Sequence, residues 1–414
     1  MPNYSQISPG PLNGKKLIEV SHMLMGPYCG MLLADLGMEV IKIEPPDGDI
    51  ARTLGPHNID GHNAYFVSLN RNKKSITLDL TTDKGRKKFH ALVAQADGLI
   101  TNLRPGAINS LGLTYDKLKH INPKIACVAM TGFGLDSIES ERPAYDYIIQ
   151  ALVGIMDLTG EPDGYPTKAG YSAVDNSAGI MGALGLLARI IEGNGGQVDI
   201  AMHDVMLSQL NYLAGAWLNA QEKPVRQSLS AHPYIVPAQV FASADGWLTL
   251  FITHDNFWNK FCEIINKSEW ITDERFCTMK KRGEHRVSLI PLLNEVMKTK
   301  TSNEWEALLI PLGIVVAGIK NLSEAIRSPL TKDREMVIKL RDSGTNFLAI
   351  GNPIKNIGYK TTYNIAPYFL LESSASISST GLPVCINGSE SVMSSQPPCI
   401  ISKESDFPIY CTSK

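Results

Sequence analysis

The first 130 residues alternate short strand-like runs with helix-like segments, and this alternation constrains the fold more than any other feature of the sequence. Runs rich in branched apolar residues predict strands at 16–20 and 39–43. Between them, residues 28–36 carry apolar side chains at helical spacing, and Gly37 can end that helix in a left-handed conformation. Such a strand–helix–strand unit predicts two neighbouring parallel strands.

The same pattern continues through the rest of this region. Strands are predicted at 75–80, 97–101 and 124–130, with an amphipathic helix at 83–95. Strands that are apolar on both faces are typical of a sheet covered by helices on both sides. The sequence therefore predicts an α/β fold with a Rossmann-like large domain built on a parallel sheet.

The later part of the chain adds three kinds of element. Residues 178–191 are apolar nearly all round, which predicts a helix buried on every side. A strand at 198–201 and a helix at 204–218 are predicted next. Residues 240–252 surround an Asp-Gly turn and predict a β-hairpin.

The length of 414 residues is too great for one small domain and predicts two domains, or one large domain with an insert. The character of the sequence changes near Pro224, so we expect a large domain over 1–222 and a smaller α+β domain over 223–330. Residues 372–414 are rich in serine and predict loop or disorder.

Composition excludes several classes of function. The 39 Lys and Arg nearly balance the 41 Asp and Glu, a net charge of −2, without the basic excess typical of nucleic-acid binding. No apolar run reaches the roughly 20 residues that cross a bilayer, and residues 1–10 do not resemble a signal peptide. The seven cysteines form no CxxC pair. We expect a cytoplasmic protein with reduced thiols and neither nucleic acid nor membrane as a partner.

Two kinds of cofactor site are not expected. The loop at 21–30 lacks the GxGxxG pattern, and Pro27 has no backbone N–H to offer a pyrophosphate, so nicotinamide binding is not predicted. A metal site usually needs histidines two to four residues apart, and this spacing is absent among His22, His203, His232 and His254. No metal site is therefore predicted.

Polar residues follow two adjacent predicted strands, with Asn102 and Arg104 after one and Thr131 after the next. Open parallel sheets bind ligands at the carboxyl ends of their strands. A basic side chain such as Arg104 can reach a phosphate there. The basic run that contains Asn72 and Lys74 either meets a phosphate too or forms a solvated turn.

Motifs spread over residues 10–368 occur in the order typical of one enzyme family. They are Gly-Pro-Leu-x-Gly at 10–14, Gly-Met-Glu-Val-Ile-Lys-Ile-Glu-Pro-Pro-Asp-Gly-Asp at 37–49, Asn-Lys-Lys-Ser-Ile-x-Leu-Asp-Leu at 72–80, Leu-Gly-Leu at 111–113, Asn-Pro at 122–123, Gly-Phe-Gly at 132–134, Tyr-Asp at 145–146, Asp-Ile-Ala-Met at 199–202 and Ala-Asp-Gly-Trp at 244–247. By these motifs the sequence resembles the class III CoA-transferases of the CaiB/BaiF type, the family of formyl-CoA transferase and the carnitine CoA-transferases. The resemblance implies the class III CoA-transferase fold, with residues 331–371 returning to the large domain.

The resemblance implies that Asp175 is the catalytic nucleophile. In the family this aspartate attacks an acyl-CoA thioester to form an anhydride, CoA returns to give an aspartyl thioester, and a small carboxylic acid collects the CoA. Asp175 lies just before the helix predicted at 178–191, where the helix dipole favours a carboxylate and free N–H groups could hold an oxyanion. The alternative is an ordinary helix-capping aspartate. Apart from CoA thioester as substrate, no bound cofactor is expected.

Five further residues are expected to bind CoA or substrate: Asn72, Lys74, Asn102, Arg104 and Tyr145. Arg104 stands where the carnitine branch of the family has a lysine that contacts CoA. Tyr145 suits a hydrogen bond to an acyl or carboxylate oxygen. Whether Cys29 or His254 contributes stays open.

Related α-methylacyl-CoA racemases carry a Gly-His-Asp motif where this sequence has Ala144-Tyr145-Asp146. A tyrosine is a poor base at neutral pH, so the sequence favours transfer over racemisation. The alternatives are a racemase or epimerase of the same fold family, or a non-catalytic CoA-binding paralogue. The resemblance also implies a homodimer of interlinked chains. The acyl donor and the acceptor acid cannot be read from these residues.

Overall fold

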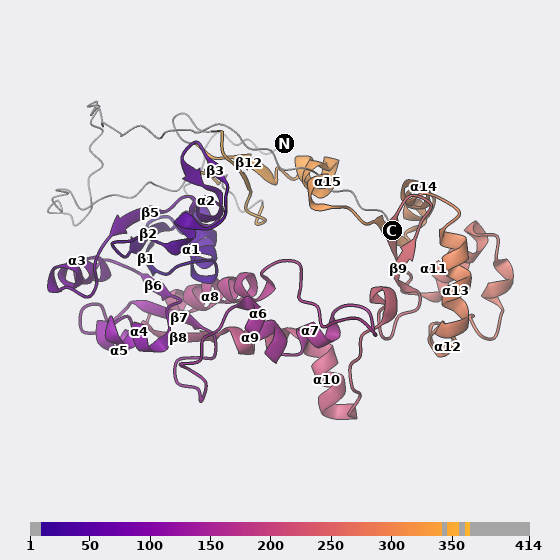
Figure 1. Ribbon diagram of the computed structural model, residues 1–414, viewed down its shortest axis with the longest axis horizontal. Coiled ribbons are helices and arrows are strands. Elements are labelled where there is room, and N and C mark those ends of the chain that lie inside the picture. Colours follow the sequence, from indigo (N-terminus) through magenta and orange to yellow (C-terminus); the bar gives the residue numbers. More distant parts are fainter. Residues whose placement is uncertain (1–9, 342–345, 356–360, 365–414) are drawn as a thin grey trace, which may run out of the picture. The chain divides into compact units, whose positions relative to one another are not determined.

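A six-stranded parallel sheet forms the centre of the N-terminal part of the chain (Figure 1). The computed structural model describes residues 10–341, 346–355 and 361–364. Across the sheet the strands are β5 (Lys74–Thr77), β2 (Glu39–Glu44), β1 (Lys16–Val20), β6 (Gly98–Thr101), β7 (Ala126–Thr131) and β8 (Gly196–Ala201). The chain winds outward from β1 in one direction and then from β6 in the other, which is the doubly wound order of Rossmann folds. The predicted α/β fold is confirmed.

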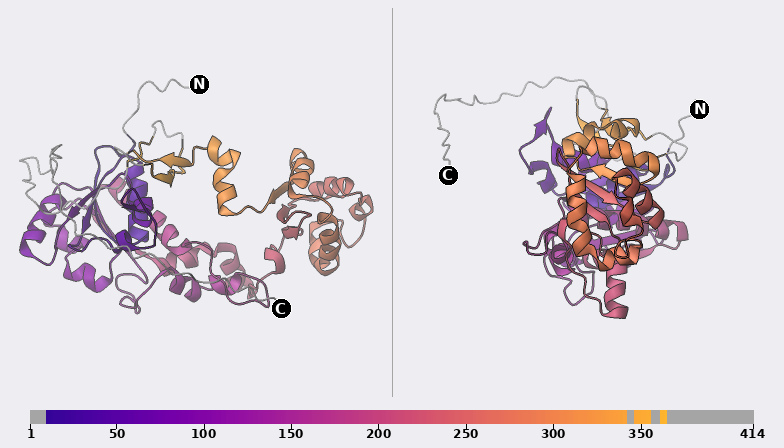
Figure 2. Two further views of the ribbon diagram at one scale, coloured as in Figure 1. Left: turned by 45° about the horizontal axis from the view of Figure 1, so that its top comes forward. Right: turned by 90° about the vertical axis from the view of Figure 1, so that its right-hand side faces the viewer.

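Helices cover both faces of this sheet (Figure 2). Side chains alternate along each strand, so Leu17 and Ile18 enter different cores. The first core packs against α1 (Met25–Asp35) and α8 (Ala173–Glu192), and the second against α3 (Asp83–Val93) and α4 (Pro105–Ser110). Burial on both faces explains why the strands read as continuous apolar runs.

The first helix ends as the sequence predicts. Gly37 follows α1 with φ of 95°, a left-handed conformation that favours glycine. Its N–H donates to Ala34 O at 3.0 Å, and Met38 N–H donates to Leu33 O at 3.1 Å. These two bonds satisfy carbonyls that the last helical turn leaves open.

The helix predicted at 204–218 is two helices in the structure. They are α9 (Met202–Gln209) and α10 (Asn211–Ala220). Asn211 has φ of 20°, outside the helical range, so the chain changes direction there. Apolar residues continue at helical spacing across this position, so the sequence pattern does not show the break.

The prediction that residues 178–191 form a helix buried on every side is wrong in two respects. The helix α8 begins at Ala173, five residues earlier, and only one of its faces packs against α1 and the sheet. On the other face large apolar side chains are exposed; they are Ile180, Met181, Leu184 and Ile191. Among the described residues, α8 is the one helix long and apolar enough to cross a membrane by length and composition.

Residues 236–316 contain a hydrophobic core of their own. Its antiparallel sheet has the order β11 (Val315–Gly318), β10 (Trp247–Phe251) and β9 (Ala238–Ala242), and β9 and β10 form the predicted hairpin. Three helices pack on this sheet: α11 (Asp255–Ile264), α13 (Arg286–Met297) and α14 (Ser302–Leu309). Trp258 and Trp305 are buried between these elements.

Residues that follow this core contact the N-terminal part again. The strands β12 (Val337–Lys339) and β13 (Leu348–Ile350) form a hairpin, and Arg71 donates to Ile350 O at 2.8 Å. Leu340 and Phe347 share a cluster with residues of α2 (Ala64–Asn70). The domain boundaries proposed from the sequence stay predictions, and the serine-rich segment 372–414 lies outside the described residues.

The remaining elements are short. They are η1 (Ile50–Thr53), β3 (Asn58–Ile59), β4 (His62–Asn63), α5 (Tyr115–Leu118), α6 (Asp146–Leu152), α7 (Ile155–Leu158), η2 (Ser228–Ser230), η3 (Ser268–Ile271), α12 (Met279–Glu284), η4 (Ile310–Leu312), α15 (Leu322–Arg327) and α16 (Pro329–Asp333). The cysteines within the described residues are all free thiols, and the cytoplasmic location stays a prediction.

Candidate active site

The strand order of the large sheet reverses between β1 and β6, and the loops that follow these two strands are joined there. His22 N–H donates to Asn102 Oδ1 at 3.0 Å, and Asn102 Nδ2 donates back to His22 O at 2.9 Å. Doubly wound sheets bind ligands at this switch point, beyond the carboxyl ends of the strands. Asn102, predicted to bind CoA, uses its side-chain amide to hold the first loop in place.

A buried cluster of two cations and two carboxylates supports that loop. Lys42 Nζ lies 3.0 Å from Glu19 Oε1 and 2.9 Å from Asp49 Oδ2, and Lys73 Nζ lies 2.8 Å from Glu19 Oε2. Each ammonium also donates to a backbone carbonyl at 2.8 Å, Lys42 to Ser21 O in the loop and Lys73 to Pro27 O in the first turn of α1. The opposite charges balance, which is the condition for burying them.

The two lysines of this cluster respond differently to their surroundings. Burial lowers the pKa of the Lys73 ammonium to about 8, although Glu19 opposes the shift. Burial also tends to lower the pKa of the Lys42 ammonium, but the charges of Glu19 and Asp49 together raise it above the usual value. Sequence analysis missed this cluster; its one visible signal is the occurrence of charged residues inside otherwise apolar strands.

Asp175 is the third residue of α8, and within the described part of the chain its carboxylate accepts no hydrogen bond. Burial raises the pKa of Asp175 to about 7, and the negative charge of Asp146 adds to the shift. Tyr65 of α2 lies within electrostatic range, because burial and then the charge of Asp175 raise the pKa of its phenol. Sequence analysis did not find Tyr65.

The first turn of α8 is capped by another helix. Asp146 Oδ2 accepts hydrogen bonds from Val174 N–H at 2.8 Å and Asp175 N–H at 3.4 Å. Ser172 occupies the N-cap position, and its side chain makes no capping bond. The alternative interpretation of Asp175 as the capping residue is therefore wrong.

The expected cradle of free N–H groups is also absent from this turn. Besides the two N–H groups bound by Asp146, Ala173 N–H donates to Tyr171 O at 2.9 Å and Asn176 N–H donates to Ser172 O at 3.1 Å. All four N-terminal amides of α8 thus have partners. A developing oxyanion needs donors from elsewhere.

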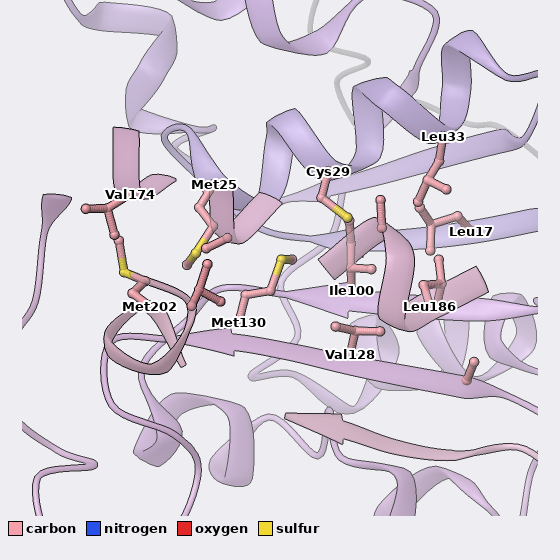
Figure 3. Close-up of a cluster of buried hydrophobic side chains, with 14 of the residues drawn as sticks. Leu17, Met25, Cys29, Leu33, Ile100, Val128, Met130, Val174, Leu186 and Met202 are labelled. Atoms are coloured by element: carbon pink, nitrogen blue, oxygen red, sulfur yellow. The ribbon is translucent and has the colours of Figure 1, made fainter. Parts of the chain in front are cut away.

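Hydrophobic packing fixes the position of this turn. Val174 is fully buried in the cluster that also contains Met25 and Met202 (Figure 3). One turn further on, a Cβ atom at Gly179 would lie 2.8 Å from Met25 O, so only glycine allows α8 to approach α1 this closely. Asp175 is therefore held beside the helix that follows the switch-point loop.

Two of the other predicted site residues have exposed side chains. Arg104 occupies the N-cap position of α4, just beyond β6, and its side chain is exposed. Tyr145 occupies the N-cap position of α6 and is 64% exposed. Arg104 therefore shares the carboxyl edge of the sheet with Asn102, and the exposed side chains of Arg104 and Tyr145 are accessible to a ligand.

The structure does not bring Asn72 and Lys74 together with Asp175. Lys74 begins β5 and pairs at 2.5 Å with Glu39, the first residue of β2, so it lies at the amino edge of the sheet. Asn72 donates to Asp35 Oδ1 at 2.9 Å and accepts from Asn364 N–H at 2.7 Å. Asn72 thus has a structural use here, and CoA binding by these two residues stays a prediction.

The two residues left open by the sequence lie in different settings. Cys29 is buried in the core, and burial raises the pKa of its thiol, so a reactive thiolate is disfavoured. His254 occupies the N-cap position just before α11, and its Nδ1 lies 2.7 Å from the Thr253 hydroxyl, while the neighbouring Asp255 carboxylate binds Arg282. The described residues contain no cluster of three potential metal ligands, and the expectation of a metal-free protein stays a prediction.

Comparison with known proteins finds relatives over most of the chain. The sequence model of CoA-transferase family III matches residues 12–368. An acetyl-CoA:oxalate CoA-transferase from Acetobacter aceti is 35% identical over 84% of this chain and 90% of its own. A succinate–glutarate CoA-transferase from Agrobacterium fabrum is 34% identical over 83% of this chain and 89% of its own. The crystal structure of a CAIB/BAIF family protein from Brucella suis is 34% identical, with a TM-score of 0.77, and covers 87% of this chain and 97% of that one.

Proposed function

The chain belongs to CoA-transferase family III, and on that premise we propose that it moves CoA from an acyl-CoA thioester to a free carboxylic acid through covalent intermediates on Asp175. One observation carries the assignment of the nucleophile. Asp175 is a partly buried carboxylate without a hydrogen-bond donor in the described residues, held beside the helix that follows the switch-point loop, with its pKa raised to about 7. Such a carboxylate is poorly stabilised as an anion and is therefore more nucleophilic than a solvated one.

The reaction proceeds by four exchanges at carbonyl carbons. An Asp175 oxygen attacks the thioester carbon, the C–S bond breaks, and CoA leaves as the thiolate. The thiolate attacks the aspartyl carbon of the anhydride and releases the donor acid, which leaves an aspartyl–CoA thioester. The acceptor carboxylate displaces the thiolate from this thioester, and the thiolate then attacks the acceptor's carbonyl to release the new acyl-CoA and the Asp175 carboxylate.

Each of these attacks passes through a tetrahedral oxyanion. Because the amides of the first turn of α8 already have partners, we assign its stabilisation to side chains. Tyr65 supports this assignment, since its phenol lies within electrostatic range of Asp175 and, with a pKa above the usual value, is a protonated hydrogen-bond donor at neutral pH. Burial of the site strengthens such a bond.

The acceptor belongs, we propose, to the small dicarboxylic acids. The two relatives described above are named for oxalate, succinate and glutarate, all of them dicarboxylic acids. A second carboxylate on the acceptor gives an enzyme a charge by which to orient the reacting one. An exposed cation at the same edge of the sheet, such as Arg104, could supply the partner.

Racemisation is not favoured by the arrangement of acid–base groups. It requires one such group on each side of the carbon next to the thioester. Both oxygens of Asp146 accept hydrogen bonds from the protein, and Tyr145 is largely exposed, so neither pairs with Asp175 as a second base. Transfer needs only one nucleophile.

Mass spectrometry of the protein after incubation with a panel of acyl-CoAs tests the proposal. We expect a CoA adduct on the wild-type chain, localised by proteolysis to the peptide containing Asp175, and no adduct on Asp175→Asn. Exchange of the substrate's α-proton for deuterium without an adduct would instead show a racemase. Binding of acyl-CoA with neither adduct nor exchange would show a non-catalytic paralogue.

A further inference from the structure

A chain of buried hydrogen bonds leads to the first turn of α8. Ala169 N–H donates to Gln150 Oε1 at 2.9 Å, and Gln150 Nε2 donates to Asp146 Oδ1 at 2.5 Å. The other oxygen of Asp146 receives the N–H groups of Val174 and Asp175. Gln150 is fully buried and Asp146 is 6% exposed, so the chain is shielded from water.

We propose that Asp146, held by Gln150, is a positioning residue of the transfer reaction, which fixes the backbone of Asp175 and places a negatively charged carboxylate beside it. This inference rests on the proposed function of Asp175. Its consequence is that the free carboxylate of Asp175 is disfavoured relative to the uncharged anhydride and thioester forms. Formation of either covalent intermediate removes the Asp175 charge and with it the repulsion from Asp146.

A purely structural cap would not need a carboxylate at this place. Ser172 already stands at the N-cap position, and a serine hydroxyl satisfies the same amides without burying a charge. Asp146 instead takes the two N–H groups that would otherwise stabilise the Asp175 anion at the helix N-terminus. Both effects act in the same direction, toward a less stable free carboxylate.

The other groups around Asp175 do not cancel this effect. The raised pKa of Asp175 has burial and Asp146 as its causes, with no cation contributing. On α2 the Tyr65 phenol lies within electrostatic range of Asp175, and on α1 the Tyr28 ring and the backbone of Cys29 lie beside the neighbouring Gly179. Within the described residues, Asp146 is therefore the charge that acts on Asp175.

Two variants separate the charge of Asp146 from its orienting role. Asp146→Asn keeps the shape and removes the charge, whereas Gln150→Ala keeps the charge and removes its support. A carbon-13 NMR titration of labelled aspartate follows the Asp175 carboxyl directly, with its resonance identified by its loss in Asp175→Asn. We expect its midpoint to fall by about one pH unit in Asp146→Asn and to change little in Gln150→Ala.

The equilibrium and the rate of adduct formation provide the second readout. In Asp146→Asn, the equilibrium constant for forming the CoA adduct at pH 8 should fall about tenfold, the equivalent of one pH unit. In Gln150→Ala we expect the acylation rate to fall roughly tenfold to a hundredfold at unchanged KM for acyl-CoA, because the nucleophile is misplaced while CoA contacts remain. Ser172→Ala is the matched control at the same helix start and should alter neither quantity, since its hydroxyl makes no capping bond.

Each outcome decides the inference. An unchanged Asp175 midpoint in folded Asp146→Asn would overturn the role of the charge, and a wild-type acylation rate in Gln150→Ala would overturn the orienting role. If Asp146→Asn does not fold, as judged by thermal unfolding, the rate of Gln150→Ala still decides. Failure of the proposed function is distinguishable, because it appears as the absence of any adduct on the wild-type chain, whereas the titration needs no turnover.

Discussion

At the scale of single residues, the first prediction concerns the nucleophile. Replacing Asp175 by Asn should abolish transfer, because an amide cannot attack the thioester, and should leave the fold intact, because Asp146 caps α8. Activity assayed on the purified variant and its circular dichroism spectrum check both statements. Full activity in Asp175→Asn would refute the mechanism.

The same variant should also be more stable than the wild type above neutral pH. The folded pKa of Asp175, about 7, lies above its unfolded value near 3.9, so the wild type loses stability as the pH rises from about 4 through 7. Allowing for partial exposure, we expect Asp175→Asn to gain about 2 kcal/mol at pH 8 and almost nothing at pH 4. Urea unfolding at the two pH values measures the difference; equal gains at both would show that Asp175 is not destabilised as an anion.

Activity should follow the same ionisation. Because the carboxylate is the reacting form, kcat/KM should rise with pH through about 7. An acid limb near the usual aspartate range, around pH 4, would mean that the free enzyme does not hold Asp175 as described. A pH–rate profile with a single acyl-CoA donor is sufficient.

The second residue for which we make a prediction is Arg104. Its exposed side chain lies just beyond β6, where a guanidinium can bind a CoA phosphate. Arg104→Ala should raise the KM for acyl-CoA by about tenfold, the loss of one charge-assisted contact, with kcat little changed. An exposed arginine outside this edge, such as Arg275, provides the control, since Arg275→Ala should leave the KM unaltered. An unchanged KM in Arg104→Ala would place CoA elsewhere.

At the scale of elements, the buried charges beneath the switch-point loop determine whether that loop keeps its shape. Removing one cation from the cluster leaves a carboxylate buried without compensation, which costs about 3–5 kcal/mol. Lys42→Met should therefore lower the free energy of unfolding by about that amount and loosen the loop that it binds at Ser21 O.

Lys74 is the matched control for this prediction. Like Lys42, it pairs with a glutamate, in this case Glu39 of β2, but its side chain is 58% exposed. Lys74→Met should therefore change stability by less than about 1 kcal/mol. Similar losses in the two variants, measured by urea unfolding, would contradict the distinction between buried and exposed pairs.

At the scale of the whole molecule, the unpaired apolar face of α8 is consistent with assembly. Ile180, Leu184 and Ile191 are each at least half exposed, and exposed apolar side chains gathered on one helix mark an interaction surface. We predict a homodimer, as the family resemblance implies, with a second copy covering this face. Interlinked chains cannot separate without unfolding, so the dimer should persist on dilution to nanomolar concentration in size-exclusion chromatography.

A substitution on that face provides the matching test. Leu184→Asp places a charge in the proposed interface and should yield monomer or aggregate. Leu322→Asp, at another exposed leucine of a different helix, should leave the dimer unchanged. A wild-type chain that is monomeric at micromolar concentration would contradict the assembly.

The sequence by itself determined the strands of the parallel sheet and the end of α1 at Gly37, because both follow from local patterns. Apolar runs report burial on two faces, and a glycine after a helix reports a left-handed cap. It also pointed to Asp175, through motifs shared with a family rather than through geometry.

Only the tertiary structure decided what surrounds Asp175. The cap of α8 comes from Asp146, 29 residues away in sequence, and Lys73 reaches Glu19 across 54 residues. No local pattern encodes such contacts, because each depends on how separate strands and helices are brought together. The same reason explains why the sequence predicts burial of α8 on every side: the pattern shows that a helix is apolar, but its neighbours decide which of its faces are covered.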